Sequence, residues 1–146
     1  MKSDPLITYR RKPATLDHQS LQQFAETLRK RVARGRAFHC RITSDAELRA
    51  LNARFLEKDY ATDVLSFPAD QGNGIGDIAI SLQRARAQAR EWRHSAEDEI
   101  RILMLHGVLH LLGMDHESDA GEMKRAESRW RRRLGLPDGL IERGAQ

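Results

Sequence analysis

The sequence predicts an α+β protein in which a small mixed four-stranded sheet packs against helices, one of which carries histidines in a zincin-like arrangement. Two observations lead to this class. Apolar residues alternate with polar ones in short segments and recur at helical spacing in longer ones. The segments follow in the order strand, helix, strand, helix, strand, strand and then helices. Only the last two strands are close enough for a hairpin-like connection, so the sheet is expected to be mixed.

The first strand is expected within residues 5–11, ahead of a break at Pro13. A helix is predicted over residues 16–34, because apolar residues recur there every three or four positions. These positions are Leu21, Phe24, Ala25, Leu28 and Val32. Gly35 is expected to end this helix, and residues 36–43 alternate in the manner of a second strand.

Residues 44–55 form the second predicted helix. Ser44 stands three residues before Glu47, which is the spacing of a capping box, in which each side chain bonds the other residue's backbone N–H. The two strands that follow are expected over residues 62–68 and 75–81, with a glycine-containing loop between them.

The C-terminal half is predicted to be helical. Ser81 can cap a helix over residues 82–92, and Ser95 can cap the next helix, over residues 96–112. A final amphipathic helix is expected over residues 118–134.

Length and composition favour one cytoplasmic domain. The 146 residues suffice for one ordinary core but not for two, so residues 1–146 are expected to form a single domain. No apolar run approaches the roughly 20 residues that span a bilayer. The first residues also lack the apolar segment of a signal peptide. The single cysteine, Cys40, has no partner for an internal disulfide, and nothing suggests secretion.

The chain is basic, with 25 Lys and Arg residues against 21 Asp and Glu residues. This balance suits an anionic partner such as RNA, although net charge concerns association and not fold. Arginine is concentrated in residues 124–135, and its guanidinium can grip a phosphate with two hydrogen bonds at once. The simpler alternative is that this run forms a solvated helix face.

Three histidines in the stretch "HGVLHLLGMDH" have the spacing of metal ligands. His106 and His110 are four residues apart on a predicted helix, so their imidazoles lie on the same face, one turn from each other. Gly113 follows where a helix end needs a residue that tolerates positive φ, and a reversal there can bring His116 back to the same ion. Three protein ligands and one open position are typical of a catalytic zinc site.

The same spacing occurs in the metzincin metalloproteases, H-E-x-x-H-x-x-G-x-x-H. Those proteases place their general-base glutamate directly after the first histidine, where this chain has Gly107. Asp115 and Glu117 lie past the turn and cannot occupy that helical position. A zinc protease is therefore a weak alternative. Asp77 could support a ligating histidine by accepting a hydrogen bond from its second ring nitrogen. Asp115 could do the same, or could simply cap the turn.

The histidine stretch resembles the H-G-x-L-H-L-x-G-[YM]-D-H signature of the YbeY family of metal-dependent endoribonucleases. Residues 51–68, "LNARFLEKDYATDVLSFP", and residues 76–81, "GDIAIS", resemble two further motifs of that family. The three motifs occur in the family's order, and the resemblance covers about residues 42–136.

The resemblance implies one zinc ion per chain, held by His106, His110 and His116. It further implies a hydrolase that cleaves single-stranded RNA, matures the 3′ end of small-subunit ribosomal RNA and acts in ribosome quality control. The partners implied are single-stranded RNA and the small ribosomal subunit, with no membrane and no DNA expected. Residues 1–146 would then be a single metallo-endoribonuclease domain.

The chain departs from the family pattern at one position. Aligning Phe55 with the family's aromatic residue puts Leu56 where the family carries an arginine held to be important for activity. Arg54 points elsewhere, whereas Arg49, seven residues before Leu56, lies on nearly the same helix face. The candidate catalytic residues are therefore His106 and Arg49. The departure keeps open a second hypothesis, a zinc-stabilised RNA- or ribosome-binding factor with little or no hydrolytic activity.

Overall fold

A mixed sheet of four strands forms the centre of the molecule. The computed structural model describes residues 6–56, 62–69, 72, 74–115 and 119–137. The strands are β1 (Ile7–Tyr9), β2 (Phe38–Thr43), β3 (Val64–Pro68) and β4 (Gly76–Ser81). Their order in the sheet is β1-β2-β4-β3, with β1, β2 and β4 parallel and β3 antiparallel to β4. The predicted mixed sheet, with its single hairpin-like pair, is confirmed.

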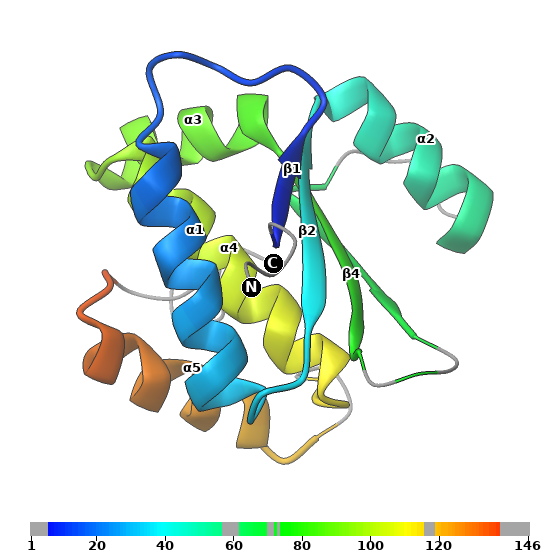
Figure 1. Ribbon diagram of the computed structural model, residues 1–146, viewed down its shortest axis with the longest axis vertical. Helices are drawn as coiled ribbons and strands as arrows, with labels where there is room; N and C mark the ends of the chain where they lie inside the picture. The colour runs from blue at the N-terminus through cyan, green and yellow to red at the C-terminus, as the bar shows by residue number, and fades with distance from the viewer. Residues whose placement is uncertain (1–5, 57–61, 70–71, 73, 116–118, 138–146) are drawn as a thin grey trace, which may run out of the picture.

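Helices cover both faces of this sheet. They are α1 (His18–Thr27) with the π-helical turn η1 (Leu28–Val32), α2 (Asp45–Leu56), α3 (Leu82–Trp92), α4 (Ala96–Leu111) and α5 (Glu122–Leu134). Helices α1, α4 and α5 lie on one side of the sheet and α2 lies on the other (Figure 1). The α+β class is therefore confirmed.

The two faces of the sheet differ in size and chemistry because side chains alternate along each strand. On β2, Cys40 and Ile42 belong to the large core cluster that includes α1 and α4, whereas the alternate residues face the other way. Leu48 of α2 packs in a smaller cluster with Leu65 of β3 and Ala79 of β4. The main core thus lies between the sheet and α4.

Helix α4 is the most buried element of the fold. Every residue from Ile102 to Leu109 is buried, including His106. A helix that is buried on all sides belongs to the interior of a protein. Ser95 caps it as predicted, since its Oγ accepts a hydrogen bond from the Asp98 amide at 3.0 Å. This helix holds its histidines on a rigid support.

Two helix starts differ from the predictions. The Ser44 hydroxyl accepts from the Glu47 amide at 3.1 Å, but the Glu47 carboxylate accepts from Arg41 and Thr43 on β2. The last helix begins at Glu122, later than predicted, because the Asp119 carboxylate binds backbone amides that a helix starting earlier would have used. The predicted first residue, Ser118, lies outside the described residues.

No helix in the described ranges combines the length and the apolar character needed to cross a bilayer.

Burial makes Cys40 an unreactive thiol. Its side chain is fully buried, and this burial raises the pKa of the thiol to about 12, because a low-dielectric surrounding disfavours the thiolate. We expect iodoacetamide to leave Cys40 unmodified in the native protein at neutral pH and to label it fully after unfolding in guanidinium chloride. Intact-protein mass spectrometry measures both states. Fast labelling of the native protein would show that this part of the core opens readily.

Candidate metal centre

Two of the three predicted metal ligands lie one helical turn apart on α4. The rings of His106 and His110 have their centroids 4.8 Å apart and cross at 72°. His106 is only 3 % exposed, whereas His110 is half-buried. The helix therefore brings the two imidazoles together as the spacing predicted. The third ligand, His116, lies outside the described residues, and within those residues no group of three potential ligands is found.

A buried glutamate from another helix supports His106. The Nδ1 atom of His106 lies 2.8 Å from Oε2 of Glu127 on α5, and the Glu127 side chain is 0 % exposed. A carboxylate only accepts hydrogen bonds when ionised, so the ring donates Nδ1–H and keeps the lone pair of Nε2. Ligating histidines are commonly held in this way, which fixes the ring and raises its basicity as a ligand. The two imidazoles of His106 and His110, with Glu127 holding the first, thus fit a metal ion that prefers imidazole.

Sequence reasoning assigned this supporting role to Asp77 and Asp115 and missed Glu127. Asp77 is wrong for the role, since its exposed carboxylate lies beside His39 on β2, with Oδ1 3.5 Å from Nδ1. A signal for Glu127 was present in the sequence. It shares the buried face of α5 with Met123 and Ala126, and a glutamate is almost never fully buried without a partner.

The chain reverses at the end of α4, as predicted. Gly113 has φ +96°, a conformation that favours glycine. Its amide donates to the carbonyl of His110 at 2.9 Å, and the Met114 amide donates to the carbonyl of Leu109 at 3.2 Å. This pair of bonds is a Schellman motif, which ends a helix and turns the chain.

Gly107 shows why the protease arrangement does not fit this fold. A Cβ atom built at Gly107 would lie 3.0 Å from two carbon atoms of the Ile78 side chain on β4. The hydroxyl of Ser66 on β3 donates to the Gly107 carbonyl at 3.3 Å, so α4 lies close against both strands. A side chain at this position would require Ile78 to give way by a few tenths of an ångström. Close packing, as well as the missing carboxylate, therefore disfavours a metzincin-like general base.

Arg49, the other candidate catalytic residue, lies on the second side of the sheet. It is an exposed residue of α2, whereas His106 is on α4, and the sheet separates these helices (Figure 1). The structure thus does not bring Arg49 together with the histidine pair.

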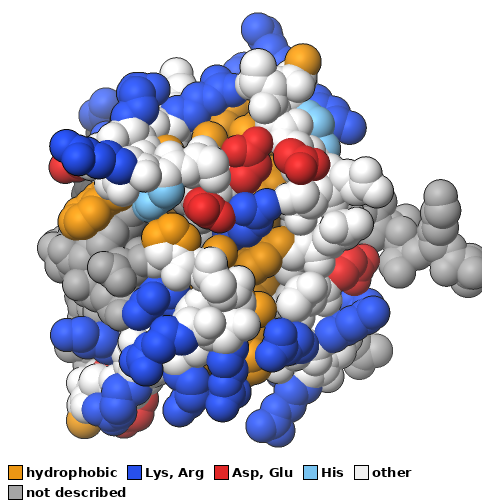
Figure 2. Space-filling view, turned by 90° about the vertical axis from the view of Figure 1, so that its left-hand side faces the viewer, with side chains coloured by type: hydrophobic (Ala, Val, Ile, Leu, Met, Phe, Trp, Pro, Cys, Tyr) orange, Lys and Arg blue, Asp and Glu red, His pale blue; other side chains and the backbone are white. Residues whose placement is uncertain are grey.

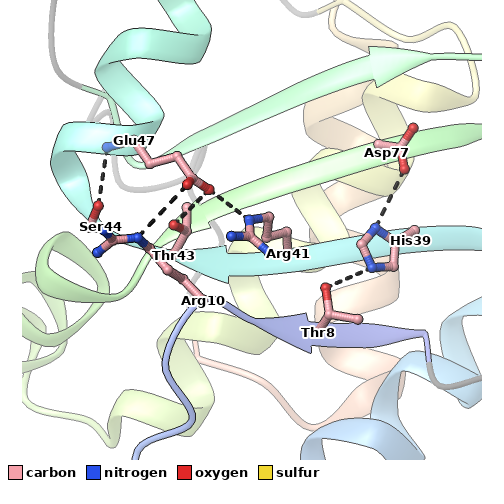
Figure 3. A network of polar contacts seen from close by, with 8 residues as sticks. All are labelled: Thr8, Arg10, His39, Arg41, Thr43, Ser44, Glu47 and Asp77. Carbon is pink, nitrogen blue, oxygen red and sulfur yellow. Dashed lines mark hydrogen bonds and ion pairs between the residues drawn. The ribbon is translucent and has the colours of Figure 1, made fainter.

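The sheet face toward α2 carries a network of charged and polar side chains (Figure 3). Arg41 Nε donates to Glu47 at 2.6 Å, and this bond lowers the pKa of Glu47 and raises that of Arg41. His39 lies 2.8 Å from the hydroxyl of Thr8 and also beside Asp77. Both basic residues line a hollow of about 360 Å³ over the sheet. The network is separate from the histidine pair, which lies on the other face.

Together, these features define an α+β protein built around a buried helix that presents two histidines in edge-to-face contact, one of them anchored by a buried carboxylate. Comparison with known families matches residues 6–135 to the family described as Endoribonuclease YbeY. The chain belongs to this family of endoribonucleases, and the resemblance inferred from the three motifs is confirmed.

Individual relatives agree with this assignment. A Solibacter usitatus protein named Endoribonuclease YbeY is 64 % identical over 137 residues, which are 94 % of this chain and 92 % of the relative. A Koribacter versatilis protein of the same name is 50 % identical over 138 residues, covering 94 % of this chain and 91 % of the relative. The solution structure of a Thermotoga maritima protein matches with a TM-score of 0.55 and 28 % identity, covering 85 % of each chain.

Replacing Glu127 by glutamine tests how His106 is held. Glutamine keeps the volume but offers an amide in place of the carboxylate, so zinc affinity is expected to fall about 10–100-fold. Competition titration with a chromogenic chelator measures that affinity. The matched control is Glu99→Gln, which changes a second buried carboxylate, 2.7 Å from His94 near the start of α4. An equal loss of affinity in both variants would mean that metal binding is weakened by general destabilisation and not by loss of the His106 contact.

Proposed function

We propose that the protein is a zinc-dependent endoribonuclease that cleaves single-stranded RNA in the cytoplasm. We further propose that it matures the 3′ end of small-subunit ribosomal RNA and acts in ribosome quality control, with the small ribosomal subunit as its partner. The observation that carries the proposal is the buried His106–Glu127 pair with His110 one turn away. That arrangement, in a family named for endoribonuclease activity, supports a metal-assisted reaction.

Each described residue of the centre has a definite task. Glu127 holds the proton of His106 on Nδ1 and so leaves Nε2 as the nitrogen that would bind a metal ion. The burial of both side chains excludes water from their hydrogen bond and keeps the ring in one orientation. His110 supplies the second imidazole, and His116 is proposed as the third ligand. Zinc bound there would supply Lewis acidity toward a phosphoryl oxygen of the RNA.

Leu56 supports a second candidate function, a zinc-stabilised RNA- or ribosome-binding factor. The family pattern has an arginine at this position, and a cation near the phosphate stabilises the negative charge that develops during cleavage. Loss of that charge would leave metal and RNA binding in place while removing most of the rate.

One experiment separates the two functions. The protein is stripped with a chelator and assayed for cleavage of a single-stranded RNA, without metal and after addition of one equivalent of zinc. An endoribonuclease regains cleavage with zinc and acts more slowly on the same RNA in a duplex. A binding factor retains RNA in both states without cutting it. A small-subunit ribosomal RNA precursor with an extended 3′ end, compared with an unrelated RNA of equal length, tests the proposed substrate.

A further inference from the structure

An arginine-lined cavity lies beside the end of α4. It has a volume of about 700 Å³ and is bounded by the end of η1 and the turn after it, by the end of α4 and by α5. Five arginines line it, and none of the described residues that line it is acidic. These arginines are Arg31, Arg34, Arg36, Arg129 and Arg133. Lys and Arg side chains also gather over the lower half of the face in Figure 2, the level at which α5 lies in Figure 1.

Trp130 holds two of these cations in place. The guanidinium carbon of Arg31 lies 5.7 Å from the centroid of its ring, and that of Arg133 lies 5.4 Å from it. The ring itself is half-buried and packs against the main core. Cation–π contacts of this kind orient a guanidinium and leave its N–H groups available to an anion. Trp130 therefore positions these two arginines at the cavity.

Arg34 lines the cavity and has a backbone conformation that is unfavourable for a residue other than glycine. Its φ is +54°, in the left-handed region that residues other than glycine rarely adopt. Hydrogen bonds on both sides hold this turn: the Ala33 amide donates to Leu28 at 2.9 Å, and the Gly35 amide donates to Arg29 at 2.7 Å. A glycine would adopt this conformation at no steric cost.

The cavity adjoins the candidate metal centre. Leu109, one residue before His110, and Leu112, just past the end of α4, both line it. Their side chains lie on another side of the helix than His110, so an RNA strand that reaches both sites passes around the end of α4.

We propose that this cavity binds the phosphate backbone of single-stranded RNA next to the nucleotide that is cleaved. The inference rests on the proposed function, because it takes the histidine pair as the place of reaction. The charge favours a polymer over a small anion, since a single phosphate carries at most two negative charges and five guanidiniums match several phosphates in a row. Contacts of this kind bind RNA without selecting a base sequence.

Two arginines in the same backbone conformation provide a matched test. Arg93 also has a left-handed φ, +59°, but it lies before the start of α4, whereas the cavity adjoins the end of that helix. The length of α4 from Ala96 to Leu109 puts about 20 Å between the two sites at 1.5 Å per residue. Arg34→Gly and Arg93→Gly each remove one guanidinium and relieve the same strain. Neither variant is expected to lower the melting temperature, so altered binding reflects the lost side chain.

The measurement is fluorescence anisotropy of a labelled oligouridylate bound to the zinc-loaded protein over a range of salt concentrations. For Arg34→Gly, the slope of log K against log salt is expected to fall by about 0.7, and the affinity in 0.1 M salt by about 5-fold, as for one lost phosphate contact. Adding Arg129→Ala should double the change in slope. Arg93→Gly should bind as the wild type does.

Equal losses in Arg34→Gly and Arg93→Gly, or no loss in either, would overturn the proposal. So would displacement of the RNA by inorganic phosphate as readily as by polyphosphate, which would indicate a site for a small anion. Failure of the proposed function has a different signature: the wild type would then bind the RNA with the expected slope but would not cleave it.

Discussion

Replacing His110 by alanine is expected to reduce bound zinc from one ion per chain to nearly none and to abolish RNA cleavage. His110 supplies one of three proposed ligands. Its ring centroid lies 4.8 Å from that of His106, and both residues belong to the buried helix α4. A catalytic zinc site with three protein ligands has no spare donor to replace a lost imidazole. Elemental analysis after dialysis measures the metal, and gel electrophoresis of a labelled RNA measures cleavage.

The control for this variant is His39→Ala. His39 is also a partly exposed histidine beside a carboxylate, but it lies on the sheet face toward α2. Its removal should leave zinc content and cleavage as in the wild type. Undiminished zinc in His110→Ala would show that the ion is not held by this helix.

Gly113→Val tests the same centre through the backbone. A Cβ atom at Gly113 would meet no atom of the described residues within 4 Å, so the added Cβ does not clash with them. Its cost is conformational, because a β-branched residue resists φ +96°. Zinc binding should weaken as the turn toward His116 is lost, and normal zinc binding would show that the reversal tolerates a side chain.

Replacing Leu56 by arginine is expected to raise the rate of RNA cleavage by about 10²–10³, equivalent to ~3–4 kcal/mol, with zinc content unchanged. The gain would come from a guanidinium near the phosphate in the transition state, as the family pattern implies. Helix α2 contacts the edge strand β3, which also contacts α4. Phe55, its neighbour on α2, packs against Phe67 of the edge strand β3 with ring centroids 5.9 Å apart. The residue before Phe67 on that strand, Ser66, donates a hydrogen bond to the carbonyl of Gly107, the neighbour of His106 in α4.

The competing hypothesis is that Arg49 already fills this role. Arg49 stands seven residues before Leu56 on α2, which is about 10 Å along the helix axis at 1.5 Å per residue. If it is the catalytic cation, Arg49→Ala abolishes cleavage and Leu56→Arg adds little. Single-turnover cleavage of one single-stranded RNA by the wild type and both variants distinguishes these results. A fast wild-type reaction that neither substitution alters would refute both assignments.

Local patterns in the sequence were sufficient to predict much of this protein. The hairpin-like pair, the serine caps and the neighbouring histidines of α4 depend on hydrogen bonds and spacings within a few residues, and these are encoded where they occur. The reversal at Gly113 is also local, because it follows from the positive φ that glycine tolerates. The motif that identified the family combines just these local features.

The partners of those features come from distant parts of the chain. Glu127 reaches His106 from a helix 21 residues further on, and Gly107 matters because Ile78 lies against it. The arginine cavity is lined by both the turn at Arg34 and α5. Nothing in the sequence of either segment indicates that the two lie together. Which helix faces meet is set by how the whole apolar surface is buried around the sheet. That burial is a sum over many weak contacts, and no short stretch of sequence contains it.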